Sequence, residues 1–148
     1  MSRPDRVPSD HPSVTTYRAT VARHGGRRRR LEVPGEAALP DAGEIVRVAL
    51  DDDICFARVD TGHSGDAYWL TGVYNSSTAA RDPTAVAASD LLGPWLRTHD
   101  RTPGRSVEID VIEPGYFIGV RAPGDRLVYP AVTKPSSSLS DIANKLQE

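Results

Sequence analysis

The alternation of apolar and polar side chains is clearest over Ser106 to Ile112, which reads S-V-E-I-D-V-I. Alternation with a period of two places successive side chains on opposite faces of a β-strand. The segment therefore predicts a half-buried antiparallel strand. Its inward face holds Val107, Ile109 and Val111, and its outward face holds Glu108 and Asp110.

Weaker alternation, interrupted by short polar turns, predicts further strands along the chain. Two of them flank the turn His24-Gly25-Gly26 and form a β-hairpin over residues 14–33. The others cover residues 44–50, 54–60, 67–74, 116–122 and 126–129. About eight short strands with little helix predict a mainly β fold with a minor α part, built as a small antiparallel barrel or a sandwich.

Apolar residues recur at helical spacing in two segments, so we expect two short helices. One lies near residues 89–99 and carries Leu91, Leu92, Trp95 and Leu96, and the other begins at Ser138 and carries Leu139, Ile142, Ala143 and Leu146. Residues 1–12 contain three prolines and little that can pack, which predicts a disordered tail. Residues 13–148 then form a single β-rich domain.

The composition limits the classes of protein to which the chain can belong. It has 148 residues, 39% of them hydrophobic, enough to bury a core without disulfides or metals. The single cysteine, Cys55, excludes an intramolecular disulfide and favours a cytoplasmic location. No apolar run approaches the roughly 20 residues that cross a bilayer, so we expect no membrane partner. The four histidines lack the paired spacing of zinc ligands, and we expect neither a metal nor a cofactor.

Charge is distributed unevenly along the chain. Residues 1–30 contain eight Arg and two Asp, for a formal charge of +6, whereas residues 31–148 have a formal charge of −8. A positive arm on a negative body is typical of proteins that bind a polyanion or an acidic partner.

The positive charge is concentrated beside the hairpin turn, in Arg23, Arg27, Arg28, Arg29 and Arg30. A guanidinium group can hold a phosphate with two parallel hydrogen bonds, and several such contacts supply the affinity for nucleic acid that does not depend on sequence. These residues predict binding to DNA or RNA, without indicating which. Two alternatives are a solvated turn and contact with an acidic protein or a second copy of the chain.

A second candidate site lies where a predicted strand runs into a loop. Tyr74, Asn75 and Arg81 gather polar groups at this exit, and Arg121 of a later strand is expected nearby. Such a cluster can bind a small ligand or support an enzyme, although an Arg81–Asp82 pair that fixes the loop explains the same residues. No catalytic residue is assigned, and the residues together favour a non-enzymatic binding protein.

Four segments carry a resemblance to a known group: T-Y-R-A-T-V-A-R, G-E-I-V-R-V-A-L-D, A-R-D-P and G-R-S-V-E-I-D-V-I-E-P-G-Y-F-I-G-V-R-A-P-G-D-R-L-V-Y. Over residues 15–147 the chain resembles small uncharacterised proteins of halophilic archaea, which implies a haloarchaeal cytoplasm and no particular activity. Over Arg30 to Leu50, the run R-L-E-V-P followed by G-E-I-V-R-V is similar to the swapped-hairpin core of AbrB-type transcription regulators. That resemblance implies contact between basic residues and DNA.

Overall fold

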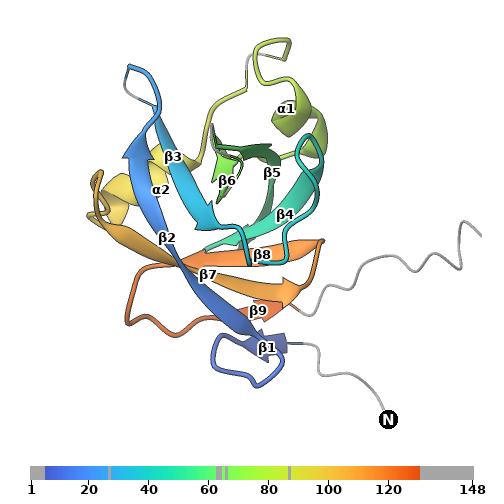
Figure 1. Cartoon of the computed structure of the whole chain (residues 1–148), viewed down its shortest axis with the longest axis vertical. Helices are drawn as coiled ribbons and strands as arrows, with labels where there is room; N and C mark the ends of the chain where they lie inside the picture. The colour runs from blue at the N-terminus through green and yellow to red at the C-terminus, as the bar shows by residue number, and fades with distance from the viewer. Residues whose placement is uncertain (1–5, 27, 63–64, 66, 87, 131–148) are drawn as a thin grey trace, which may run out of the picture.

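The computed structural model describes residues 6–26, 28–62, 65, 67–86 and 88–130. The fold is mainly β, as predicted: seven strands close into a barrel in the order β2-β3-β6-β5-β4-β8-β7, and β1 and β9 form a separate two-stranded sheet (Figure 1). The strands are β1 (Arg6–Pro8), β2 (Thr15–Arg23), β3 (Arg29–Pro34), β4 (Ile45–Leu50), β5 (Asp53–Thr61), β6 (Ala67–Leu70), β7 (Ser106–Glu113), β8 (Phe117–Arg121) and β9 (Val128–Pro130). The helices are α1 (Ser77–Arg81) and α2 (Leu92–Thr98).

The interior of the barrel is filled by the inward side chains of its strands. The alternating residues predicted to face inward on β7, Val107, Ile109 and Val111, are all buried in the core. Val46 and Val48 of β4 behave in the same way. Burial of branched apolar side chains on every second position is the main stabilising contribution in such a small barrel, and it leaves functional groups for the outer wall.

Helix α2 forms within the segment predicted to be helical and packs its apolar side against the barrel. Leu92, Trp95 and Leu96 are buried, and Pro94 lies in the first turn, where its missing N–H is not needed. The Asp90 carboxylate accepts hydrogen bonds from the backbone N–H groups of Leu92 and Val73, both at 2.9 Å. Asp90 therefore ties the start of the helix to the chain that leaves β6.

The sheet is mainly antiparallel, as predicted, but one pair of neighbouring strands is parallel. β4 and β8 run parallel, with Ala49 opposite Gly119 in the register. A parallel neighbour requires a long crossover, and here the chain from β5 to β7 supplies it before β8 returns beside β4. Local alternation carries no information about strand direction, so the sequence pattern could not show this.

The prediction of a disordered tail over residues 1–12 is wrong for residues 6–12. Strand β1 pairs antiparallel with β9 at the other end of the chain, and Val7 lies opposite Tyr129. Burial of Val7 and Ser9 and the hydrogen bond from the Ser9 N–H to the Leu127 carbonyl, at 2.8 Å, order this segment. Residues 1–5, and the helix predicted to begin at Ser138, lie outside the described residues.

Asp110 also differs from its prediction, because it points outward from β7 yet is fully buried. It accepts hydrogen bonds from Thr16 Oγ1 (2.6 Å), Arg121 Nε (2.7 Å) and the Tyr129 hydroxyl (2.5 Å). Strand β9 covers this part of the outer wall and brings the tyrosine over the carboxylate. A buried charge is tolerated when it is paired and hydrogen-bonded in this way.

Candidate functional site

The predicted basic hairpin is formed by β2 and β3, and its turn depends on two glycines. Gly25 and Gly26 have φ angles of 65° and 53°, a region that side-chain-bearing residues rarely adopt. The last two pairs of the ladder are Ala22 with Arg30 and Arg23 with Arg29. The His24 N–H then bonds to the Arg28 carbonyl at 3.0 Å and closes the turn.

Strand alternation sorts the hairpin arginines onto two faces. Arg23 and Arg29 face each other and continue the inward face of Val21 and Leu31 beyond the end of the barrel core. His24, Arg28 and Arg30 lie on the outer face. Arg27 lies outside the described residues. The described hairpin arginines therefore form two basic surfaces, one on each face of the hairpin.

Arg30 is held within the outer face by its own chain. Its Nη2 lies 2.8 Å from the Glu32 carboxylate, its Nη1 donates to the Arg23 carbonyl at 2.9 Å, and its guanidinium stacks 3.8 Å from the centre of the Trp69 ring. Bidentate pairing and stacking fix this side chain in place. Arg30 is thus held by an acidic neighbour and an aromatic ring of its own chain.

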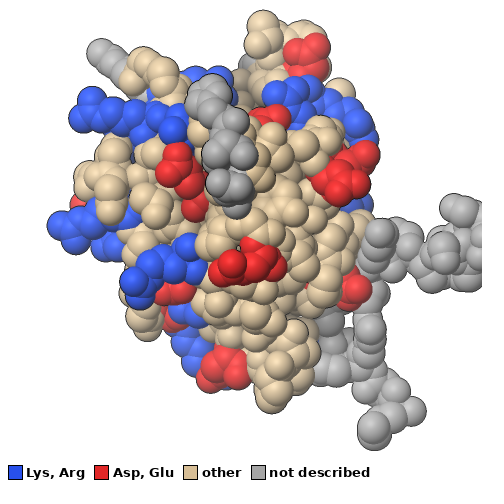
Figure 2. Space-filling view, viewed as in Figure 1, with Lys and Arg blue, Asp and Glu red and all other residues tan. Residues whose placement is uncertain are grey.

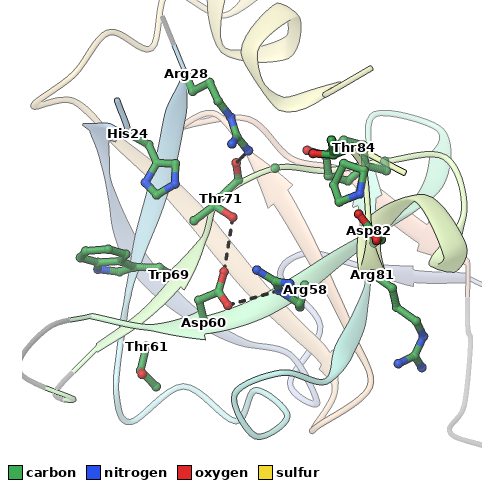
Figure 3. A pocket seen from close by; sticks show the side chains of 14 residues that line it. His24, Arg28, Arg58, Asp60, Thr61, Trp69, Thr71, Arg81, Asp82 and Thr84 are labelled. Carbon is green, nitrogen blue, oxygen red and sulfur yellow. Dashed lines mark hydrogen bonds and ion pairs between the residues drawn. The ribbon is translucent and has the colours of Figure 1, made fainter. Parts of the chain in front are cut away.

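On the outer face of the hairpin lies a hollow of about 720 Å³, which we call the outer cleft. Its walls are the hairpin and the chain that follows α1, and its floor is the outer wall of β5 and β6 together with Thr71 to Tyr74. Figure 3 shows Arg28 reaching from the hairpin toward Thr71 and Arg58 pointing toward Asp60. The side chains central to the argument are His24, Arg28, Arg58, Asp60, Trp69 and Arg81.

Most polar groups on the floor of the outer cleft have a partner. Arg28 Nη2 donates to the Thr71 carbonyl at 2.8 Å, and Arg58 Nε lies 3.3 Å from the Asp60 carboxylate. His24 stands beside these groups, and partial burial, followed by the charges of Arg28 and Arg30, lowers its pKa. A neutral imidazole among guanidinium groups indicates a positive local potential, which an anion would neutralise.

The inward face of the hairpin borders a second and smaller hollow of about 190 Å³, which we call the inner hollow. Arg29 lines it from the hairpin, and Arg97 and Arg101 line it from α2 and the chain that follows. Arg101 is oriented by hydrogen bonds from Nε to the His99 carbonyl and from Nη1 to the Ser106 carbonyl, at 3.1 and 3.3 Å. The structure thus gathers three arginines from separate segments around this hollow.

The four residues of the predicted loop-exit site do not stay together. Tyr74 and Arg81 line the outer cleft, with Arg81 at its rim and extending away from Arg28 and Arg58 in Figure 3. Burial, and secondarily the charge of Asp90, raises the pKa of the Tyr74 hydroxyl, and the nearby Arg28 and Arg58 only partly oppose this shift. Asn75 is exposed and does not line the cleft. Arg121 instead pairs with the buried Asp110, and the hydrogen bond to that carboxylate raises the pKa of Arg121.

Several residues of the two hollows were not found by sequence reasoning. Trp69 faces Arg30 because β6 pairs with β3 and places it opposite Glu32. Arg58 and Arg97 reach the hairpin from positions about 30 and 70 residues away along the chain. Each is a single charged or aromatic residue in an ordinary strand or helix, so only the pairing of the strands and the packing of α2 could identify it.

The sequence matches a known family over residues 3–146, nearly its whole length. The chain belongs to DUF7112, a family of unknown function. No curated protein and no solved structure matches it. The expectation of an uncharacterised family is confirmed, and the DUF7112 match covers the barrel, the hairpin and both hollows.

Charges of both signs alternate on the surface of this DUF7112 chain. Figure 2 shows arginine side chains over the hairpin end, with acidic side chains interspersed among them. Around the two hollows the balance is positive: three arginines and two aspartates line the outer cleft, and three arginines and one aspartate line the inner hollow. The excess of positive charge seen in the first 30 residues is therefore concentrated in space at the two sides of the hairpin. Elsewhere on the face shown in Figure 2 the charges of both signs are mixed.

Two further findings concern the part of this DUF7112 chain that the structure describes. Within it, no group of three or more His, Cys, Asp or Glu side chains is arranged to hold a metal ion. None of its helices is long and apolar enough to span a membrane. Cys55 is buried in the core, and burial, with a smaller effect of Asp53, raises the pKa of its thiol, which makes it a packing residue.

Proposed function

We propose that the protein is a non-enzymatic nucleic-acid-binding protein that contacts phosphates through the arginines of its hairpin. The observation that carries this proposal is the convergence of arginines from separate segments on both sides of one hairpin. Arg23 and Arg28 are exposed, while Arg58 and Arg97 extend the basic surface beyond the hairpin itself. Guanidinium groups in such an array suit the repeated charge of a phosphate backbone.

The charge of the rest of the molecule also supports binding of a polyanion at the hairpin. Residues 31–148 have a formal charge of −8, so a polyanion is repelled from most of the barrel and attracted to the hairpin end. Arg30 contributes by holding Trp69 and the strand geometry, because its guanidinium is already paired with Glu32. The proposal assigns the contacts to phosphate to Arg23, Arg28 and Arg29 on the two faces of the hairpin, with Arg27 as the fourth member of the predicted cluster.

A haloarchaeal, cytoplasmic setting is part of the proposal, on the grounds of the sequence resemblance, the single cysteine and the bias toward 16 Arg and 14 Asp. At molar salt the Debye length is about 3 Å, so only charges in direct contact still attract each other. Bidentate guanidinium–phosphate pairs meet that condition. Unfolding followed by circular dichroism tests the setting: stability that rises into molar KCl supports it, and stability that falls contradicts it.

Salt-dependent binding tests the function itself. Fluorescence anisotropy with labelled random-sequence DNA and RNA is measured between about 50 and 200 mM salt for the parent chain and for R23A/R28A. The variant should bind more weakly and lose about 0.9 from the slope of log K against log salt for each phosphate contact removed. As a control, Arg126→Ala removes a single positive charge at the far end of the molecule, beside β1 and β9, and should leave the slope unchanged.

Two outcomes would overturn the proposal, one by excluding phosphate binding at the hairpin and the other by assigning the arginines to a protein contact. Equal slopes for the parent and R23A/R28A would show that the hairpin does not hold phosphate. Salt-sensitive self-association in light scattering, without any binding of nucleic acid, would assign the arginines to contact with a second copy of the chain or an acidic protein.

The volume of the outer cleft favours one further candidate function. About 720 Å³ is within the range of small-ligand pockets, and Tyr74 and Arg81 of the predicted loop-exit site line it. A small anionic ligand could bind there through Arg28 and Arg58. Isothermal titration with inorganic phosphate and nucleoside monophosphates tests this candidate, and binding that survives in R23A but is lost in R58A would support it over a nucleic acid.

A further inference from the structure

The hairpin projects beyond the barrel by three paired positions. Among the described residues, the last backbone hydrogen bonds from β2 to the rest of the barrel involve Val21, with Arg105 and Gly104. Beyond them the pairs are Ala22 with Arg30, Arg23 with Arg29 and His24 with Arg28. At about 3.3 Å per residue the projection is about 10 Å long. Figure 1 shows the end of this hairpin extending past β6 and β7, while the Arg30 side chain at its base stays in contact with Trp69 of β6.

The dimensions of this projection match one groove of double-stranded DNA. Sheets pack about 10 Å apart, so a two-stranded ribbon with side chains on both faces is about 10 Å thick. The major groove of B-DNA is about 12 Å wide and about 8.5 Å deep, and it admits a two-stranded β-ribbon. A ribbon that enters tip first would place one face toward each of the two sugar-phosphate backbones that border the groove.

The arginines are distributed as that arrangement requires. Arg28 on the outer face borders the outer cleft, where Arg58 lies behind it, and Arg29 on the inward face borders the inner hollow, where Arg97 lies behind it. Each side of the hairpin thus offers a basic recess at the base of the projection. A single phosphate backbone would use one of these recesses and leave the other unexplained.

We propose that the nucleic acid is duplex DNA, that the hairpin enters its major groove tip first, and that one backbone lies in the outer cleft and the other in the inner hollow. This inference rests on the proposed function and names its substrate class. Most of the contacts are to phosphate, so the binding has little sequence preference.

The aromatic residues near the hairpin argue against a single strand. Proteins that hold single strands stack successive bases on aromatic rings. Trp69 carries Arg30 on its ring at 3.8 Å and has His24 at its edge, 6.2 Å between ring centres, while Tyr74 is only 5% exposed. A duplex of RNA is disfavoured by a different feature, since the major groove of A-form RNA is too deep and narrow for side chains to read.

The test compares three probes and three single variants. The probes are a random-sequence DNA duplex, one of its strands alone, and an RNA duplex of the same length. The variants are Arg58→Ala in the outer cleft, Arg97→Ala beside the inner hollow and, as a control of equal charge, Arg126→Ala. Thermal unfolding confirms that each variant is folded. Neither Arg58 nor Arg97 belongs to the hairpin, so their effects report on the recesses.

We expect the DNA duplex to bind about ten-fold more tightly than the other two probes, a difference of about 1.4 kcal/mol. Arg58→Ala and Arg97→Ala should each lower the salt slope by about 0.9, whereas Arg126→Ala should not change it. If the single strand or the RNA duplex binds as tightly as the DNA duplex, or if only one of the two recess variants changes the slope, the duplex inference is wrong while the proposed function stands. If no probe binds, both are wrong.

Discussion

The hydroxyl of Tyr129 donates a hydrogen bond of 2.5 Å to the buried carboxylate of Asp110. The two residues come from β9 and β7, and Thr16 of β2 and Arg121 of β8 bond to the same carboxylate. Burial, followed by the hydrogen bond to Asp110, raises the pKa of Tyr129 well above its ordinary value. Four strands thus meet at one acidic side chain, which holds the β1–β9 sheet on the wall of the barrel.

Tyr129→Phe tests this junction. The substitution keeps the ring but removes one donor from a carboxylate that is fully buried, so the unfolding free energy should fall by about 1–3 kcal/mol. Urea denaturation measures the loss. Tyr116→Phe removes a hydroxyl from a half-buried ring in the same apolar cluster and should cost less, because Tyr116 does not bond to the buried carboxylate. Equal stability of Tyr129→Phe and the parent would show that the hydrogen bond contributes nothing.

Gly119→Ala tests how closely β9 lies against β8. A Cβ at this position would stand 2.3 Å from ring atoms of Tyr129, so the ring must move away from Asp110. Overpacking of this kind should lower stability by about 1–3 kcal/mol in the same denaturation assay. Gly93→Ala is the matched control, because its Cβ lies 3.5 Å from the flexible Arg97 and alanine favours a helix. A tolerated Gly119→Ala would contradict the close contact.

His24 should titrate below its ordinary value, since burial and the neighbouring arginines lower its pKa. The folded state then resists protonation, so His24 contributes stability above pH 6.5 that is lost as the pH falls toward its lowered pKa. Nuclear magnetic resonance titration of the imidazole measures this directly. Bound phosphate should raise the pKa again, by neutralising Arg28. A His24 pKa that is unchanged by saturating DNA would place the backbone away from the outer cleft.

Glu32→Gln should strengthen binding to DNA. The substitution releases Arg30 from its ion pair at 2.8 Å and removes one negative charge from the outer face of the hairpin. We expect a steeper salt slope, by up to about 0.9, together with a higher affinity in anisotropy. Glu113→Gln, at the distant end of β7, is the control and should change neither. A weaker complex for Glu32→Gln would mean that Arg30 acts on DNA only through its anchored geometry.

The sequence located the strands and helices of this fold better than it indicated which strands pair with each other. Period-two alternation located β7 and its buried Val107, and helical spacing located α2, because both signals are local. The parallel pairing of β4 with β8 and the pairing of β1 with β9 depend on segments far apart in the chain. For the same reason Asp110 was expected at the surface, although its partners Arg121 and Tyr129 cover it.

The candidate site was predictable to a similar extent. The arginine run and the Gly25-Gly26 turn mark the hairpin by local composition alone. Alternation along the strands also implies that Arg28 and Arg29 point to opposite sides. The residues that complete each side, Arg58 and Arg97, could not be found, because a lone arginine in a strand or helix is indistinguishable from a solubilising charge.

The central claim is that the hairpin arginines hold phosphate on both faces, and salt-dependent binding of duplex DNA by R28A, R29A and the double variant R28A/R29A tests it most directly. Each single variant should lower the slope of log K against log salt by about 0.9, and the double variant by about twice that amount, with Arg126→Ala unchanged. A double variant with the slope of the parent chain would contradict the claim.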